Sequence, residues 1–305
     1  MAAWKTIRIT KPCALRIDNG NLIVDDGTER FKLSLEDTDS IVFEGDRFTI
    51  SAKAIEMLSR HKVATLFCDA YYLPSAILHP YHQSSLATKT LKAQIACDVS
   101  YADSLWARIV EAKINLQLEV LEILDKPVGK IPRYLMQIVD GDRYGVEAKS
   151  AKVYWQYLFK GITREQNSLD LRNQALNYAY AIIRSLVTRD LSAAGFLPAL
   201  GLWHDNSYNA FNLSDDLMEP LRPIMDLGVF GVVQKHADEE ILTSQMKKEI
   251  IALIDLENVQ YEKGLSSLRN ASKLYIQQFK RSIHCKDATL LSFPKFDREK
   301  IGECI

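Results

Sequence analysis

The hydrophobic period of this chain changes near residue 80, and that change constrains its fold more than any other feature. Up to residue 50, short apolar stretches alternate with turn signals such as Asn19-Gly20, which is typical of strands joined by tight turns. From residue 86 onward, apolar residues recur every three or four positions, which is the period of amphipathic helices. The sequence therefore predicts an α+β fold with three parts: a small N-terminal β-rich domain at 1–80, a linker at 81–85, and a larger, all-helical domain at 86–305.

The two domains can be divided into individual elements. Strands are predicted at 6–10, 14–17, 22–24, 31–35, 40–43, 48–50 and 63–68, with a second tight turn at Gly45-Asp46. Ser51 is suited to cap a helix at 51–61. Helices of the larger domain are predicted at 86–98, 102–125, 145–160, 169–194, 214–230, 237–257 and 266–283. The residues from about 290 onward look like a docked or frayed tail.

Charge and cysteine content exclude several classes of protein. With 38 Lys and Arg against 39 Asp and Glu, the formal net charge of the 305 residues is −1, so any DNA-binding surface must be a local positive patch. The five cysteines form no Cys-x-x-Cys pair, which argues against a zinc ribbon or a disulfide framework and fits a reducing compartment. No apolar signal core and no run of roughly 18 apolar residues occurs. We therefore expect a soluble, cytoplasmic protein that makes no membrane contact.

An imidazole and two carboxylates suggest a metal site in the helical domain. Asp216 and Glu219 are three residues apart, so they share one face if a helical turn begins near residue 214, and His204 precedes them in a segment punctuated by Gly and Pro. Oxygen ligands with one imidazole suit Mg²⁺ or Mn²⁺ better than a structural Zn²⁺. The same pattern also fits a helix N-terminus, where acidic residues favour the macrodipole, preceded by a histidine with no metal role.

Glu147 is the candidate for a third ligand. It follows Gly145 at the predicted start of a helix and has basic neighbours, Lys149 and Lys152. A single Glu in a first helical turn is usually a surface residue that interacts favourably with the helix dipole. Its position alone therefore leaves both interpretations open.

Several motifs occur together in an order that resembles a known family. They are Glu147, the helical segment from Asn173 to Arg184, Gly195-Phe-Leu-Pro198, His204, and Asp216-Leu-Met-Glu219-Pro-Leu-Arg222-Pro223. In this order they resemble the CRISPR-associated integrase, the metal-dependent endonuclease-like subunit that captures foreign DNA as new spacers. The resemblance covers nearly the whole chain. The residues of the last motif are most similar to those of family members from type II systems, which use a single effector nuclease.

The resemblance carries expectations about the site and its partners. It implies that Glu147, His204 and Glu219 are the catalytic residues and coordinate Mg²⁺ or Mn²⁺. Asp216 matches a further acidic position, which could be a ligand, an orienter of His204 or a helix cap. It also implies a homodimer formed through the β-rich domain, a hetero-oligomer with the small ferredoxin-like CRISPR-associated subunit, and double-stranded DNA, both protospacer and CRISPR repeat, as substrate.

The chemistry expected of such a site is phosphodiester transesterification. A DNA 3′-hydroxyl that attacks a phosphate must lose a proton while negative charge builds on the phosphate oxygens, and a carboxylate-held cation can assist both changes. The same site could instead direct water, which would give nuclease activity. The residues alone leave the nucleophile and the number of metal ions open.

Basic and aromatic residues around these motifs are candidates for DNA contact. Phosphate contacts are predicted for Arg222, Lys149, Lys152 and Arg143, with Arg184 and Arg189 as further candidates, and base stacking for Tyr154, Trp155 and Trp203. Basic residues on helices more often form solvated faces or ion pairs, and aromatics at helical spacing more often lie in the core. Arg222 could pair with Asp216 or Glu219 instead.

Three other functions fit parts of the pattern. The dipeptide His204-Asp205 suggests a phosphohydrolase of the His-Asp type, but that class needs further histidines upstream, and the nearest is His82. A non-catalytic helical DNA-binding or interaction module would not depend on Glu147. A structure-selective, metal-dependent DNA nuclease would share the site and differ in its nucleophile.

Overall fold

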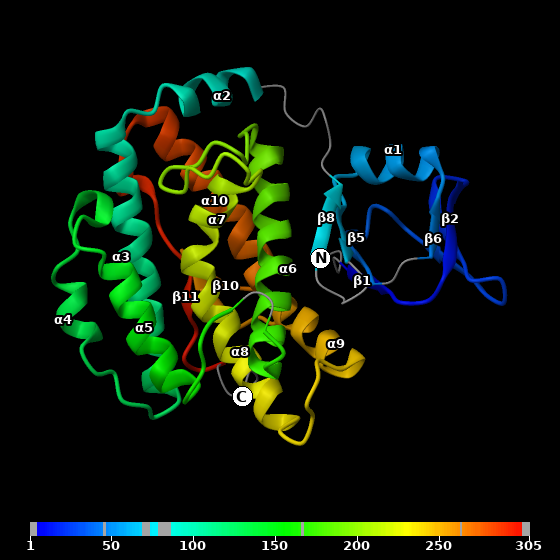
Figure 1. The fold of residues 1–305 in the computed structure, drawn as a ribbon. Coiled ribbons are helices and arrows are strands. Elements are labelled where there is room, and N and C mark those ends of the chain that lie inside the picture. Colours follow the sequence, from blue (N-terminus) through cyan, green and yellow to red (C-terminus); the bar gives the residue numbers. More distant parts are fainter. Residues whose placement is uncertain are drawn as a thin grey trace. The chain divides into compact units, whose positions relative to one another are not determined.

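The structure is a computed structural model of the chain (Figure 1), and it describes residues 5–44, 47–68, 74–78, 87–165, 168–262 and 264–300. The chain divides into two compact units, residues 1–84 and 85–305. The predicted linker at 81–85 and the predicted turn at Gly45-Asp46 lie outside the described residues.

The described residues of the N-terminal unit form two four-stranded sheets, with strand orders β1-β5-β7-β8 and β4-β3-β2-β6, and one helix. These elements are β1 (Lys5–Ile9), β2 (Cys13–Asp18), β3 (Asn21–Asp25), β4 (Arg30–Leu33), β5 (Thr38–Phe43), β6 (Phe48–Ile50), α1 (Ala52–Arg60), β7 (Ala64–Cys68) and β8 (Pro74–Leu78). Asn19 and Gly20 both have positive φ, as a two-residue hairpin turn between β2 and β3 requires. The Ser51 side chain caps α1, and the core gathers buried apolar side chains that include Leu15, Leu22 and Ile41.

Strand β8 is not among the predicted strands. It pairs antiparallel with β7 at the edge of its sheet, where a proline at the first position removes no ladder hydrogen bond that the strand needs. The other strands of this unit agree with the predicted ranges to within two residues at each end.

The second unit is largely helical. Its helices are α2 (Ala87–Ile95), α3 (Val99–Ile123), α4 (Ile131–Leu135), α5 (Val146–Leu158), α6 (Leu171–Ala194), α7 (Asn212–Met218), α8 (Arg222–Lys235), α9 (Ser244–Ala252) and α10 (Leu268–Cys285), with short 3₁₀ turns η1 (Asp140–Asp142), η2 (Glu219–Leu221), η3 (Leu253–Asp255) and η4 (Ala288–Leu290). Helix α3 packs on α5, α8 and η2, while α6 packs on α7, α8 and α10 (Figure 1). These contacts bring the first turn of α5 and the turn η2 to the same helix, α3.

Several details differ from the prediction for this unit, among them the short helix α4, which is not among the predicted helices. The helix predicted at 214–230 is divided into α7, η2 and α8, because Pro220 and Pro223 lack the N–H groups that a continuous helix uses. The helix predicted at 237–257 is shorter, since Thr243 caps α9. The unit is not all-helical: a small antiparallel sheet is formed by β9 (Val259–Tyr261), β10 (Gly264–Ser266) and β11 (Lys295–Phe296). Because β11 lies in the tail, its pairing with β9 attaches the tail to the rest of the unit. Strands this short leave no periodic pattern to find.

No helix in the described ranges is long and apolar enough to cross a membrane.

Candidate metal centre

Glu147 is fixed by the way α5 begins. Gly145 has a φ of 59°, in the left-handed region that glycine adopts without strain, and the helix starts at the next residue. The Asp142 carboxylate accepts hydrogen bonds from the backbone N–H groups of Val146 at 2.7 Å and Glu147 at 3.0 Å. Asp142 therefore caps the helix, and the Glu147 side chain projects from a defined first turn.

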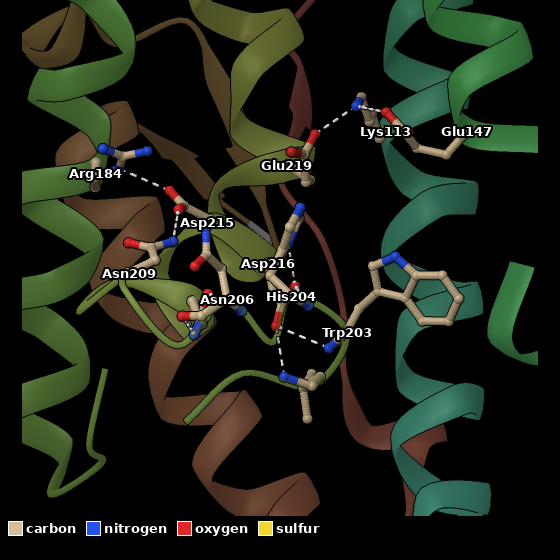
Figure 2. A network of polar contacts seen from close by, with 12 residues as sticks. Lys113, Glu147, Arg184, Trp203, His204, Asn206, Asn209, Asp215, Asp216 and Glu219 are labelled. Carbon is tan, nitrogen blue, oxygen red and sulfur yellow. Dashed lines mark hydrogen bonds and ion pairs between the residues drawn. The ribbon is translucent and has the colours of Figure 1, made fainter. Parts of the chain in front are cut away.

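Asp216 binds the loop that carries His204 (Figure 2). One carboxylate oxygen accepts from the backbone N–H of Leu202 at 2.6 Å and of Trp203 at 3.1 Å, and the other accepts from the backbone N–H of His204 at 3.1 Å. The second oxygen also lies 2.7 Å from Nδ1 of the imidazole. A carboxylate has about four acceptor positions. Asp216, which is fully buried, uses them on this loop and is placed to orient His204.

This bonding determines which imidazole nitrogen could bind a metal. With Nδ1 donating to Asp216, Nε2 is the nitrogen that remains available as a ligand. The hydrogen bond to Asp216 is the main reason that the pKa of His204 is raised, although burial opposes the shift. The negative charge of Glu219 also raises the pKa of His204.

Gly201 allows this loop to approach Asp216. A Cβ at this position would lie 2.1 Å from the backbone oxygen of His204 and 2.9 Å from the Asp216 carboxylate. Both distances are shorter than van der Waals contact, so a side chain would displace the loop. Gly201 in the segment before His204 therefore has a steric role.

Trp106 contacts the imidazole of His204 and the ring of Trp203. The ring of Trp106, on α3, stacks on Trp203 with centroids 5.5 Å apart and meets the imidazole edge-on at 5.8 Å. Trp106 is buried, whereas Trp203 is 44% exposed and offers an aromatic surface beside the site.

Glu147 and Glu219 meet at a third side chain, Lys113 of α3 (Figure 2). The Lys113 ammonium donates a hydrogen bond to Glu147 Oε1 and lies 2.5 Å from Glu219 Oε2. This ion pair is the contact that compensates the buried Glu219 oxygen. Arg222 supplies a second positive charge, 3.1 Å from the other Glu219 oxygen.

The charges of these groups follow from their mutual contacts. Burial alone would raise the pKa of Glu219, but the positive charges of Arg222 and Lys113 outweigh it and lower that pKa. Burial alone would lower the pKa of Lys113, but the carboxylates of Glu219 and Glu147 raise it. The acid and the lysine are both charged at neutral pH, as a buried pair must be to offset its desolvation.

This arrangement has the chemistry of a divalent-cation site, with an ammonium at its centre. Among the described residues, no three His, Cys, Asp or Glu side chains form a ready-made metal-binding group. The oxygens of Glu147 and Glu219 nevertheless face one point, and Lys113 Nζ marks it as a position for positive charge. Two carboxylates with a nearby imidazole are a donor set that suits Mg²⁺ or Mn²⁺.

Some residues considered for DNA contact are exposed, whereas Arg222 is engaged in an ion pair. Arg143, Lys149 and Lys152 have exposed side chains near Glu147, as a phosphate contact requires, and the Lys149 ammonium also donates to the backbone oxygen of Tyr144 at 2.5 Å. Arg222 is occupied by Glu219, and its guanidinium stacks 4.9 Å from the ring centroid of Tyr180.

Other residues considered for DNA contact already have partners within the protein. Arg184 pairs with Asp215 at 2.7 Å. Arg189 is buried beside Asp190, and Tyr154 is fully buried and donates to Asp226, so neither is placed to touch DNA in this conformation.

The dipeptide His204-Asp205 does not act as a pair. His204 binds Asp216, while Asp205 is exposed. His82, the nearest upstream histidine, lies outside the described residues. The geometry therefore gives no support to a phosphohydrolase site of the His-Asp type.

Comparisons with known proteins agree with the fold and the motifs. The model of the family "CRISPR associated protein Cas1" matches residues 7–251. The CRISPR-associated endonuclease Cas1 of Neisseria meningitidis serogroup C (strain 8013) is 31% identical over 295 residues, covering 96% of each chain. A casposase bound to integration product superimposes with a TM-score of 0.81 at 21% identity over 93% of each chain. A Cas6-RT-Cas1–Cas2 complex gives 0.76 at 17% identity, covering 96% of this chain and 36% of that one.

Fold, motif order and sequence similarity together define a CRISPR-associated endonuclease. The chain belongs to the Cas1 family, whose enzymes act in the acquisition of CRISPR spacers.

Proposed function

We propose that this protein is a metal-dependent integrase that inserts foreign DNA fragments as new spacers by attack of a DNA 3′-hydroxyl on a phosphodiester. The observation that carries the proposal is that Glu147 and Glu219, from separate elements, face one cation position near His204. Mg²⁺ or Mn²⁺ bound there would activate the nucleophile and neutralise the charge that develops on the phosphate.

Each protein residue has a defined part in this proposal. Glu147, Glu219 and Nε2 of His204 hold the ion. Asp216 fixes the tautomer and direction of the imidazole through Nδ1 and keeps its loop closed on α7. Arg222 keeps Glu219 ionised in its buried position.

DNA binding is proposed to use a local positive surface, since the formal net charge is only −1. The exposed residues Arg143, Lys149 and Lys152 surround the start of α5 and would contact phosphates next to Glu147. Arg222 would contribute through the part of its side chain, 26%, that stays accessible.

The proposed assembly is a homodimer formed through the β-rich unit, in a complex with the small ferredoxin-like CRISPR-associated subunit and double-stranded protospacer and repeat DNA. Support comes from the similar fold in a Cas6-RT-Cas1–Cas2 complex and in a casposase bound to integration product. We also propose a type II system, for which the 31% identity to the Neisseria protein is suggestive.

The test is a strand-joining assay with a labelled DNA 3′-end, a repeat-containing duplex, Mn²⁺ and the small partner subunit. His204→Ala and Glu219→Ala should each lower the joining rate by several orders of magnitude while DNA binding is retained, because positioning and metal activation both fail. Full joining activity in either folded variant would refute the assignment. An equal loss of DNA binding would indicate a structural role.

Hydrolysis is the second candidate reaction, because the similar Neisseria protein is named an endonuclease. The same residues would then direct water at a branched DNA substrate. If the same preparation cleaves branched DNA but joins no 3′-end in the presence of the partner, the protein is a structure-selective nuclease and the integrase proposal is wrong.

A further inference from the structure

Lys113 is a buried lysine, so its positive charge must be compensated by nearby groups. Lys113 is only 5% exposed, on a stretch of α3 whose neighbours Ile109, Ile114 and Leu116 are buried. Removing an ammonium from water is strongly unfavourable unless anions and hydrogen bonds compensate it. A buried lysine is therefore expected to make charged contacts that an apolar side chain could not make.

Among the ion pairs of the described residues, Lys113 is the only cation that contacts both Glu147 and Glu219. Arg222 pairs with Glu219 alone. Two carboxylates that face one point repel each other, so without a cation between them the start of α5 and the turn η2 would separate. Lys113 therefore offsets that repulsion and keeps both side chains aimed at the same place.

A divalent ion held by Glu147 and Glu219 would occupy the position of the Lys113 ammonium. Oxygen ligands lie about 2.0 to 2.6 Å from Mg²⁺, Mn²⁺ or Ca²⁺, and the ammonium nitrogen is 2.5 Å from Glu219 Oε2 and in hydrogen-bond contact with Glu147. The two cations cannot share the position. Lys113 has a flexible four-carbon stem, so its ammonium can leave the position while its backbone stays in α3.

We propose that Lys113 is a positioning residue of the metal centre: its ammonium holds Glu147 and Glu219 ready in the metal-free protein and gives up its position when a divalent ion binds. The proposal rests on the metal site proposed above. It makes the lysine a competitor of the ion as well as an organiser of its ligands. The metal-free state is thereby stabilised, and the apparent affinity for the ion is lowered.

The test is titration calorimetry of Mn²⁺ binding to the full-length chain, with Lys113→Met and Lys113→Gln compared with the wild type. Both variants should bind Mn²⁺ at least about tenfold more tightly, since the ion displaces no ammonium, and the rise in Tm on adding Mn²⁺ should be larger than in the wild type. Lys130→Met, which removes an exposed lysine, controls for the change in net charge and should match the wild type.

A merely structural role predicts the opposite direction, because a disturbed site binds metal less well. Equal or weaker Mn²⁺ binding in both variants would overturn the proposal, as would failure of both to fold even at saturating Mn²⁺. Folding that is recovered by Mn²⁺ would support it. If the wild type binds Mn²⁺ no better than Glu219→Gln, the metal site itself is wrong, and that outcome is distinct from a failure of the Lys113 inference alone.

Discussion

Nδ1 of His204 lies 2.7 Å from a carboxylate oxygen of the fully buried Asp216, and the same carboxylate accepts three backbone N–H groups from the loop that carries the histidine. One acidic side chain therefore sets both the path of the loop and the direction of the imidazole. Asp216 is thereby placed to orient His204, one of the three roles that the resemblance leaves open for it.

Replacing Asp216 with Asn should weaken both the fold and the metal site. The new amide group turns an N–H toward backbone N–H donors, and each buried donor left without an acceptor costs about 1 to 3 kcal/mol. Loss of such an orienting partner typically lowers metal affinity about 10- to 100-fold. Urea denaturation and Mn²⁺ titration measure the two effects, and an unchanged Mn²⁺ affinity in a folded Asp216→Asn protein would show that His204 needs no orienter.

The close contact at Gly201 gives a steric prediction. In Gly201→Ala, the added Cβ would meet the His204 backbone oxygen at 2.1 Å, so the loop must shift, with a loss of about 1 to 3 kcal/mol of unfolding free energy. Gly264→Ala is the matched control, because a Cβ there meets nothing within 4 Å. Equal stability and equal Mn²⁺ affinity in the two variants would contradict the role given to Gly201.

The order of the motifs was enough to single out Glu147 and Glu219, which the structure brings to one cation position, and His204, whose loop Asp216 holds; that the three bind a metal together stays a prediction. Lys113 could not be singled out, since one lysine in a predicted helix usually belongs to a solvated face. Its place among buried neighbours at helical spacing was the available signal. The strands β9 to β11 are too short for periodicity, and their pairing is decided by contacts distant in the sequence.

The buried carboxylate of Asp226 gives a prediction for pH. Burial raises its pKa to about 6, although hydrogen bonds from Tyr180 and Tyr154 and the charges of Arg164 and Arg222 oppose the shift. Because the folded protein holds this proton more tightly than the unfolded chain, the stabilisation is present at low pH and is lost as pH rises from about 4 through about 6.

The amount is on the order of 3 kcal/mol, from two pKa units at about 1.4 kcal/mol each. Unfolding free energy is measured between pH 4 and 7 for the wild type and for Asp226→Asn, and the difference between the two curves isolates this group. A difference that does not vary with pH would show that Asp226 keeps an ordinary pKa.

The exposed lysines near Glu147 give a prediction for DNA binding. Lys149→Gln and Lys152→Gln should each weaken binding to unrelated DNA sequences and flatten the slope of log affinity against log salt by about one unit, since each phosphate contact releases about one counterion. An unchanged slope in both variants would place the DNA elsewhere.

Arg222→Gln provides the contrast in the same experiment. A slope reduced by about one unit would show that Arg222 contacts a phosphate, as its sequence position predicts. An unchanged slope with weaker Mn²⁺ binding would show that it acts through its ion pair with Glu219.

We propose that Glu147, His204 and Glu219 surround one divalent ion, and anomalous diffraction from crystals grown with Mn²⁺ tests this most directly. We predict one anomalous peak within about 2.0 to 2.6 Å of carboxylate oxygens of Glu147 and Glu219 and a similar distance from Nε2 of His204, with the Lys113 ammonium moved away from that point. A Mn²⁺ peak remote from these residues, or Glu147 turned into solvent and distant from His204, would contradict the account.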